Sequence, residues 1–160
     1  MGHAYIDRSA LVSRSHGFST SSVAFAGEQL LEFKFVTKRI DAKIVEAPKI
    51  DGQTLIVSKA FGVAYFKDGR IAVKDFVFSA DLLKGAGPIR GYSTYTFEDG
   101  SSITASFTGE IKEGVPHGVY TILSGTGTYA NATGKGSFDG IPSRFEGASL
   151  LNGKLEVRTP

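Results

Sequence analysis

Residues 118–140 read GVYTILSGTGTYANATGKGSFDG, and this stretch decides the fold that the rest of the chain has to match. It holds six glycines, two tyrosines and no run of helix-forming residues. Glycine inside an extended segment marks a bulge, a tight bend or the close approach of another backbone. Glycines at this density predict two strands that bend sharply, as strands do when a sheet closes on itself.

A nucleotide-binding loop is the alternative interpretation of the same stretch. Residues 125–130, GTGTYA, fit the spacing GxGxx(G/A) of a dinucleotide fingerprint. That loop has to open a helix, whose N-terminus holds the pyrophosphate. Asn131, Thr133 and Gly134 follow directly and do not sustain a helix. We therefore interpret the glycines as part of the architecture.

Strand and turn patterns fill the rest of the chain. Residues 29–37 alternate with a period of two, with Leu31, Phe33 and Phe35 on one face, which predicts a half-buried strand. Asp68-Gly69 and Asp99-Gly100 are two-residue hairpin signals of the type I′ kind. Further turns are predicted at 51–52, 81–88, 113–116 and 152–153, and a bulge or bend at Gly62. About eight to ten short strands and no amphipathic helix indicate an all-β sandwich or barrel, and glycines within strands favour a closed antiparallel barrel.

Composition limits the classes of function. The 160 residues are 41% hydrophobic and 21% charged, which predicts a single globular domain over 1–160. A net charge of +2 without a basic cluster argues against a nucleic-acid partner. Cysteine is absent, so disulfides and thiolate sites are excluded, and we expect a cytoplasmic protein. No apolar run approaches the roughly 20 residues of a membrane helix, so no membrane span is expected.

The first 26 residues form an expected N-terminal strand or arm. They are rich in serine and hold Arg8 and Arg14 against one acidic residue, Asp7, a composition that loosely resembles an organelle transit peptide. An ordinary strand over Ala4–Val12 with a following loop is the interpretation we adopt.

Asp75 is the first candidate catalytic residue. It shares a strand face with Ile71, Val73 and Val77, whereas Lys74 lies on the opposite face beside Ala72, Phe76 and Phe78. If the Asp75 face points into the barrel, desolvation raises the pKa of this carboxyl and makes it a general acid or base. If the other face points inward, Asp75 is solvated and Lys74 is the unusual residue.

Aromatic and charged strand residues complete the candidate site. Tyr92 and Tyr95 lie on opposite faces of one strand and are candidate catalytic phenols. A phenol in a cavity offers an apolar wall with a polar tip, which suits a mostly apolar ligand. The candidate ligand-binding residues are Glu32, Phe33, Arg90 and Tyr120. The three histidines lack a paired spacing, so no metal site is expected.

The two tyrosine-bearing segments carry a resemblance to a known superfamily. Residues 92–103 read YSTYTFEDGSSI and residues 125–138 read GTGTYANATGKGSF. Together they resemble the C-terminal half of the allene oxide cyclase and dirigent protein superfamily, and the match covers about residues 92–140. The resemblance implies a closed eight-stranded antiparallel barrel with a hydrophobic cavity, assembled as a homodimer or homotrimer and working without a cofactor. It transfers no catalytic residue, because the cyclase's active-site residues lie in the half that does not align.

Three functions follow from these observations. The first is a cofactor-free isomerase, cyclase or lyase that acts on a hydrophobic or phenolic small molecule held in the cavity. The second is a non-catalytic barrel that binds a small lipophilic ligand. The third is an assembly module with a solidly packed barrel. The lining of the barrel interior discriminates between them.

Overall fold

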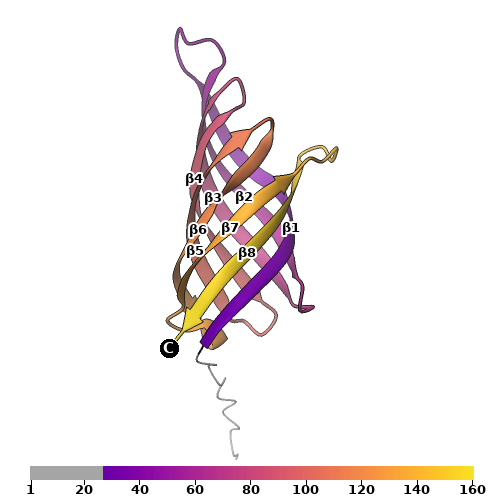
Figure 1. The fold of residues 1–160 in the computed structure, drawn as a ribbon. Helices are drawn as coiled ribbons and strands as arrows, with labels where there is room; N and C mark the ends of the chain where they lie inside the picture. Colours follow the sequence, from indigo (N-terminus) through magenta and orange to yellow (C-terminus); the bar gives the residue numbers. More distant parts are fainter. Residues whose placement is uncertain (1–26) are drawn as a thin grey trace, which may run out of the picture.

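Eight antiparallel strands close into a barrel in the computed structural model, which describes residues 27–160 (Figure 1). The strands are β1 (Gly27–Glu46), β2 (Gln53–Phe66), β3 (Ile71–Leu83), β4 (Gly87–Phe97), β5 (Ser102–Lys112), β6 (Val115–Thr126), β7 (Thr133–Ile141) and β8 (Ala148–Thr159). Each strand pairs with the next, and β8 pairs back with β1. The all-β closed barrel expected from the sequence is confirmed. The expected strand at Ala4–Val12 and the transit-peptide resemblance lie outside the described residues.

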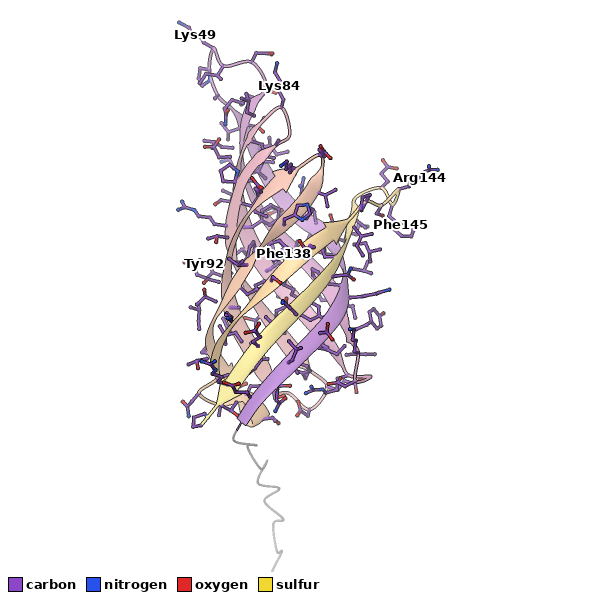
Figure 2. The ribbon with its side chains drawn as sticks, viewed as in Figure 1. Lys49, Lys84, Tyr92, Phe138, Arg144 and Phe145 are labelled. Atoms are coloured by element: carbon purple, nitrogen blue, oxygen red, sulfur yellow. The ribbon has the colours of Figure 1, made fainter. Side chains whose placement is uncertain are left out.

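The connections lie alternately at the two ends of the barrel. The β2–β3 and β4–β5 turns lie at one end, together with residue 27, the C-terminus and the short 3-10 turn η1 (Gly127–Tyr129). The β1–β2, β3–β4, β5–β6 and β7–β8 connections lie at the other end, where the β1–β2 hairpin projects farthest (Figure 1). Lys49 lies near the tip of that hairpin (Figure 2). Among residues 27–160 there is no helix with the length and apolar character needed to cross a membrane.

The hairpin turns at Asp68-Gly69 and Asp99-Gly100 lie where the sequence predicts them, but neither has the predicted type I′ geometry. The Gly69 and Gly100 N–H groups donate to the carbonyls of Phe66 and Phe97, and each glycine has positive φ, 90° and 81°. The preceding aspartates do not have positive φ, so these are three-residue loops that end in a left-handed glycine. Type I′ geometry occurs instead at Lys84-Gly85 and Glu113-Gly114, where both residues have positive φ.

Two sequence predictions within strands are wrong. Asn152 and Gly153 form no turn, because β8 runs straight through them and Gly153 pairs with Phe33 and Phe138. Gly62 makes no bulge, since it lies in unbroken register opposite Thr37, and the irregularity in β1–β2 pairing is at Arg39/Asp41.

Glycine and aromatic residues fit together across the barrel wall. At four inward-facing glycines, an added Cβ would overlap a phenyl ring from the neighbouring strand. The pairs are Gly62 with Phe35, Gly91 with Phe107, Gly118 with Phe138, and Gly153 with Phe33. The glycines therefore leave the space that the interior rings occupy, which is the close approach that glycine within a strand permits.

An aromatic stack fills the end of the barrel that carries η1. Ring centroids are 5.1 Å apart for Phe33 and Phe66, 5.2 Å for Phe66 and Phe97, and 5.0 Å for Phe97 and Tyr129. All four side chains are buried. The Arg70 guanidinium lies 5.4 Å from the centre of the Phe97 ring and donates a hydrogen bond to the Tyr129 hydroxyl. Within residues 27–160 this end of the interior is packed with rings.

Candidate functional site

A pocket of about 510 Å³ enters the barrel from the end opposite the aromatic stack. Its wall is largely aromatic, and residues from the β5–β6 and β7–β8 connections, such as Gly114 and Gly147, form its rim. The rings that line it are Phe35, Phe76, Phe78, Phe107, Tyr120 and Phe138. The volume lies within the range of about 300–1,000 Å³ that is typical of small-molecule sites.

Lys74 lies at the inner end of this pocket. It is on β3, its side chain is only 3% exposed, and its Nζ donates a hydrogen bond of 2.7 Å to the Tyr120 hydroxyl. Among the residues that the structure describes, no carboxylate is paired with it. Burial therefore lowers the pKa of the Lys74 amine well below its ordinary value.

Aromatic rings surround the Lys74 amine. The distances from Nζ to the ring centres are 4.5 Å for Phe35, 5.0 Å for Phe76, 4.8 Å for Tyr95, 5.8 Å for Phe107 and 4.8 Å for Tyr120. Ring faces attract an ammonium group and partly offset the loss of its hydration. The rings also limit the contact of the amine with water, in keeping with its burial.

Two hydroxyls on β4 are buried beside this amine. Tyr95 pairs with Lys74 and Ser93 pairs with Phe76 across the β3–β4 ladder. Neither Tyr95 Oη nor Ser93 Oγ has a hydrogen-bond partner within residues 27–160. Burial raises the pKa of both the Tyr95 and the Tyr120 phenol, so both remain protonated donors at neutral pH. Unpaired buried hydroxyls are uncommon in proteins, and these two lie behind the residues that line the pocket rather than among them.

The polar groups of the pocket lining are cationic or neutral. Lys38 and Arg39 of β1 join Lys74 on the lining, and no aspartate or glutamate belongs to it. Thr37 is buried, and its hydroxyl donates to the Phe61 carbonyl at 3.0 Å, so it is not free for a ligand. The electrostatics of the pocket therefore favour a ligand that carries an electron-rich or acidic oxygen.

Three of the residues selected from the sequence point into the barrel. Tyr120 lines the pocket and contacts Lys74, and Tyr95 lies against the same amine. Phe33 is buried in the aromatic stack, with its ring 5.4 Å from that of Tyr95, so it supports the inner end of the site rather than lining the pocket.

The other four selected residues lie on the outer surface. Asp75 is exposed, so the inward-facing carboxylate is a wrong placement, and the second alternative, with Lys74 inside, is the one the fold adopts. Tyr92 is 60% exposed and projects from the wall (Figure 2). Glu32 forms an ion pair with Lys67 at 2.7 Å, and Arg90 is exposed and donates to Ser79 at 3.5 Å.

The alternation of residues along β3 does not identify Lys74 as the buried charged residue. Apolar residues occupy both faces of the strand, so alternation alone does not say which face is buried. The available signal was ring volume, because Phe76 and Phe78 share the face of Lys74 whereas smaller residues share that of Asp75. Over residues 27–160, no cluster of His, Cys, Asp or Glu is arranged to hold a metal ion.

The comparisons with known proteins agree with this geometry. No family model and no curated protein matches the chain in sequence. The solved structure of the pterocarpan synthase dirigent protein GePTS1 matches with a TM-score of 0.56 at 17% identity, over 92% of this chain and 98% of that one. The pterocarpan synthase dirigent protein PsPTS1 matches with a TM-score of 0.57 at 15% identity, over 82% and 95%. The chain has the barrel fold of the dirigent proteins, as residues 92–140 implied.

Proposed function

We propose that this barrel binds a mostly apolar small molecule with a phenolic or similarly acidic hydroxyl and directs the course of its reaction. The observation that carries the proposal is the open aromatic pocket that ends at the Lys74–Tyr120 pair. The fold shared with two pterocarpan synthase dirigent proteins supports the same class of ligand.

The proposed binding mode follows from the two kinds of surface in the pocket. The aromatic wall takes up the apolar body of the ligand through area burial and ring contacts. The ligand hydroxyl meets the Lys74 amine, which accepts the proton when neutral and pairs with the oxygen when protonated. The phenol of Tyr120 supplies a second contact, because its oxygen lies 2.7 Å from Nζ.

Direction of the reaction then rests on orientation. A reactive molecule held in one conformer between rigid strands reacts through that conformer. Orientation of this kind lowers the activation free energy by several kcal/mol, and by about 7–11 kcal/mol in the best intramolecular systems. The expected isomerase, cyclase or lyase chemistry is one form of such control. It needs no group beyond the pocket wall and the amine–phenol pair.

Lys74 is expected to set a preference for free hydroxyls. A hydrophobic phenol should bind the wild-type chain about 5- to 30-fold more tightly than its methyl ether, since one hydrogen bond to a charged or strongly polar group contributes roughly 1–2 kcal/mol. Lys74→Met should abolish this preference, and Lys59→Met, on the exposed face of β2, should keep it. Thermal-shift titration and calorimetry measure both compounds; equal affinity of the phenol and the ether for wild type contradicts the proposal.

A carrier is the second candidate function. The wall carries six aromatic rings and, among the residues that the structure describes, no carboxylate, which suits storage or transport of a lipophilic phenol as well as its conversion. The two functions differ in their effect on products. A directing barrel changes the product or enantiomer ratio of a phenol that binds it, as measured by chiral chromatography, whereas a carrier leaves the ratio unchanged.

Self-association is expected through the outer face of β2–β4. Exposed apolar side chains lie side by side there, with Val77 opposite Tyr92 and Ile71 opposite Tyr65, and Phe61 nearby. A closed barrel has no free strand edge, so a second copy would pack face to face on this apolar surface. Val77→Lys should shift the chain from a dimer or trimer to a monomer in light scattering, and Leu123→Lys on β6 should not. A wild-type monomer at every concentration argues against this assembly.

A further inference from the structure

We propose that Lys74 acts as a nucleophile that captures a hydrophobic aldehyde or ketone in the pocket as an imine. This inference rests on the proposed function of the pocket as a small-molecule site, and it adds a covalent step at a defined atom. It assigns the carbonyl group as a second ligand chemistry beside the phenolic hydroxyl.

Access and restraint at the amine carry the first part of the argument. Lys74 lines the open pocket, although only 3% of its surface is exposed. The one described hydrogen bond of Nζ goes to the Tyr120 hydroxyl, and this bond holds the amine in place. Lys74 at the same time belongs to the lining of the pocket. A carbonyl that enters the pocket head first meets this nitrogen at the inner end.

The surroundings keep the amine in its reactive form. Only the neutral amine has the lone pair that attacks a carbonyl, and most exposed lysines at neutral pH are protonated. The absence of a paired carboxylate within the described chain disfavours the ammonium form, and burial lowers the pKa of Lys74 by more than the ring faces restore. The same desolvation activates catalytic lysines that form Schiff bases.

The Tyr120 hydroxyl is placed to transfer protons to the oxygen of the carbonyl. In the first step the Nζ lone pair forms a bond to the carbonyl carbon, and the C=O electron pair moves to oxygen. The oxygen takes up a proton and the nitrogen loses one, which gives a neutral carbinolamine. In the second step the C–O bond breaks, the oxygen leaves as water with the second nitrogen-bound hydrogen, and the C=N bond forms. Tyr120, which is hydrogen-bonded to Nζ and lines the pocket, is the proton donor to the departing oxygen and regains its proton from the nitrogen.

Reductive trapping tests the proposal on the full chain. Phenylpropanal and cyanoborohydride at neutral pH should give one rapid adduct per chain, which peptide mapping places on Lys74, at least tenfold faster than on any exposed lysine. Lys74→Met should lose the rapid adduct, and Lys34→Met, on the outer face of β1, should retain it. A hydrophobic phenol added in excess should slow the labelling of Lys74 alone.

Each contrary result has a separate meaning. Adducts spread over exposed lysines with Lys74 unmodified overturn the inference, and site mapping on the wild-type chain shows this without any variant. If Lys74 is unmodified while the phenol still shifts the melting temperature, the imine step is wrong and the pocket proposal stands. If the phenol does not bind and Lys74 is unmodified, both fail.

Discussion

Lys74→Met is expected to raise the free energy of unfolding by about 1–3 kcal/mol at neutral pH, because burying an amine that has one hydrogen bond to Tyr120 and no paired carboxylate among the described residues costs roughly that much. Methionine has nearly the same length and suits the surrounding rings, since its thioether packs well against aromatic side chains. Lys74→Met should therefore both raise the free energy of unfolding and abolish the preference for a phenol over its methyl ether. Urea unfolding monitored by circular dichroism measures the first effect.

The pH dependence gives a sharper form of this prediction. The folded chain lowers the pKa of Lys74 below its ordinary value of 10.5, so between the folded and unfolded pKa values the unfolded state binds one more proton. The stability of the wild type therefore rises with pH in this window, by up to about 1.4 kcal/mol per pH unit. Lys74→Met lacks the rise, so its advantage should shrink between pH 7 and pH 9.5.

The upper limit of the window comes from the tyrosines. Burial raises the pKa of Tyr95 and Tyr120 above 10, so above that pH the unfolded chain loses their protons first and stability falls again.

As a control, Lys59→Met on the outer surface should change stability by less than about 0.5 kcal/mol. A wild-type stability that runs parallel to that of Lys74→Met over the window would show that Lys74 stays protonated.

Gly153→Ala should lower the melting temperature by about 3–10 °C, the equivalent of about 1–3 kcal/mol of overpacking in a domain of this size. The added methyl group would overlap the Phe33 ring. That ring has no room to move, because it lies between Phe66 at 5.1 Å and Tyr95 at 5.4 Å. Differential scanning calorimetry gives the effect directly.

A double-mutant cycle identifies the cause. If the ring overlap is responsible, Gly153→Ala should cost less in a Phe33→Leu background, with a coupling energy of about 0.5–3 kcal/mol. The neighbouring Asn152→Ala, whose side chain faces solvent, is the matched control and should change little. Equal costs in both backgrounds would place the damage in the backbone of β8 instead.

Closure of the barrel was predictable from the chain because its signals are local. The in-strand glycines of residues 118–140 and the glycine-bearing turns each follow from the conformations open to glycine. Gly153 shows the limit of such signals, since Asn-Gly is typical of a turn and nothing within the chain segment reveals the Phe33 ring across β1–β8. Partners on other strands decide such positions.

The site was less predictable for a related reason. The sequence named Tyr92, Tyr95 and Tyr120 without fixing which of them face inward, and the structure buries Tyr95 and Tyr120 and exposes Tyr92. The inward or outward phase of β3 likewise depended on which face the closed barrel buries. Both Lys74 and Asp75 were visible in the sequence, and only the sheet register across β2, β3 and β4 separates them. A charged residue in a strand indicates a functional site only once it is known whether its side chain faces the barrel interior or the solvent.

Within residues 27–160, the aromatic stack fills the η1 end of the interior, and the pocket that holds Lys74 opens at the other end. Any molecule that reaches Lys74 has to enter leading with its reactive group and leave by backing out along the same path, so two molecules cannot pass one another inside. Length along the barrel axis, rather than girth alone, then limits which molecules fit with their polar head at the amine. A compound that stays in the lumen also blocks entry of the next, so the rate at which a bound molecule leaves limits how often the pocket can be refilled.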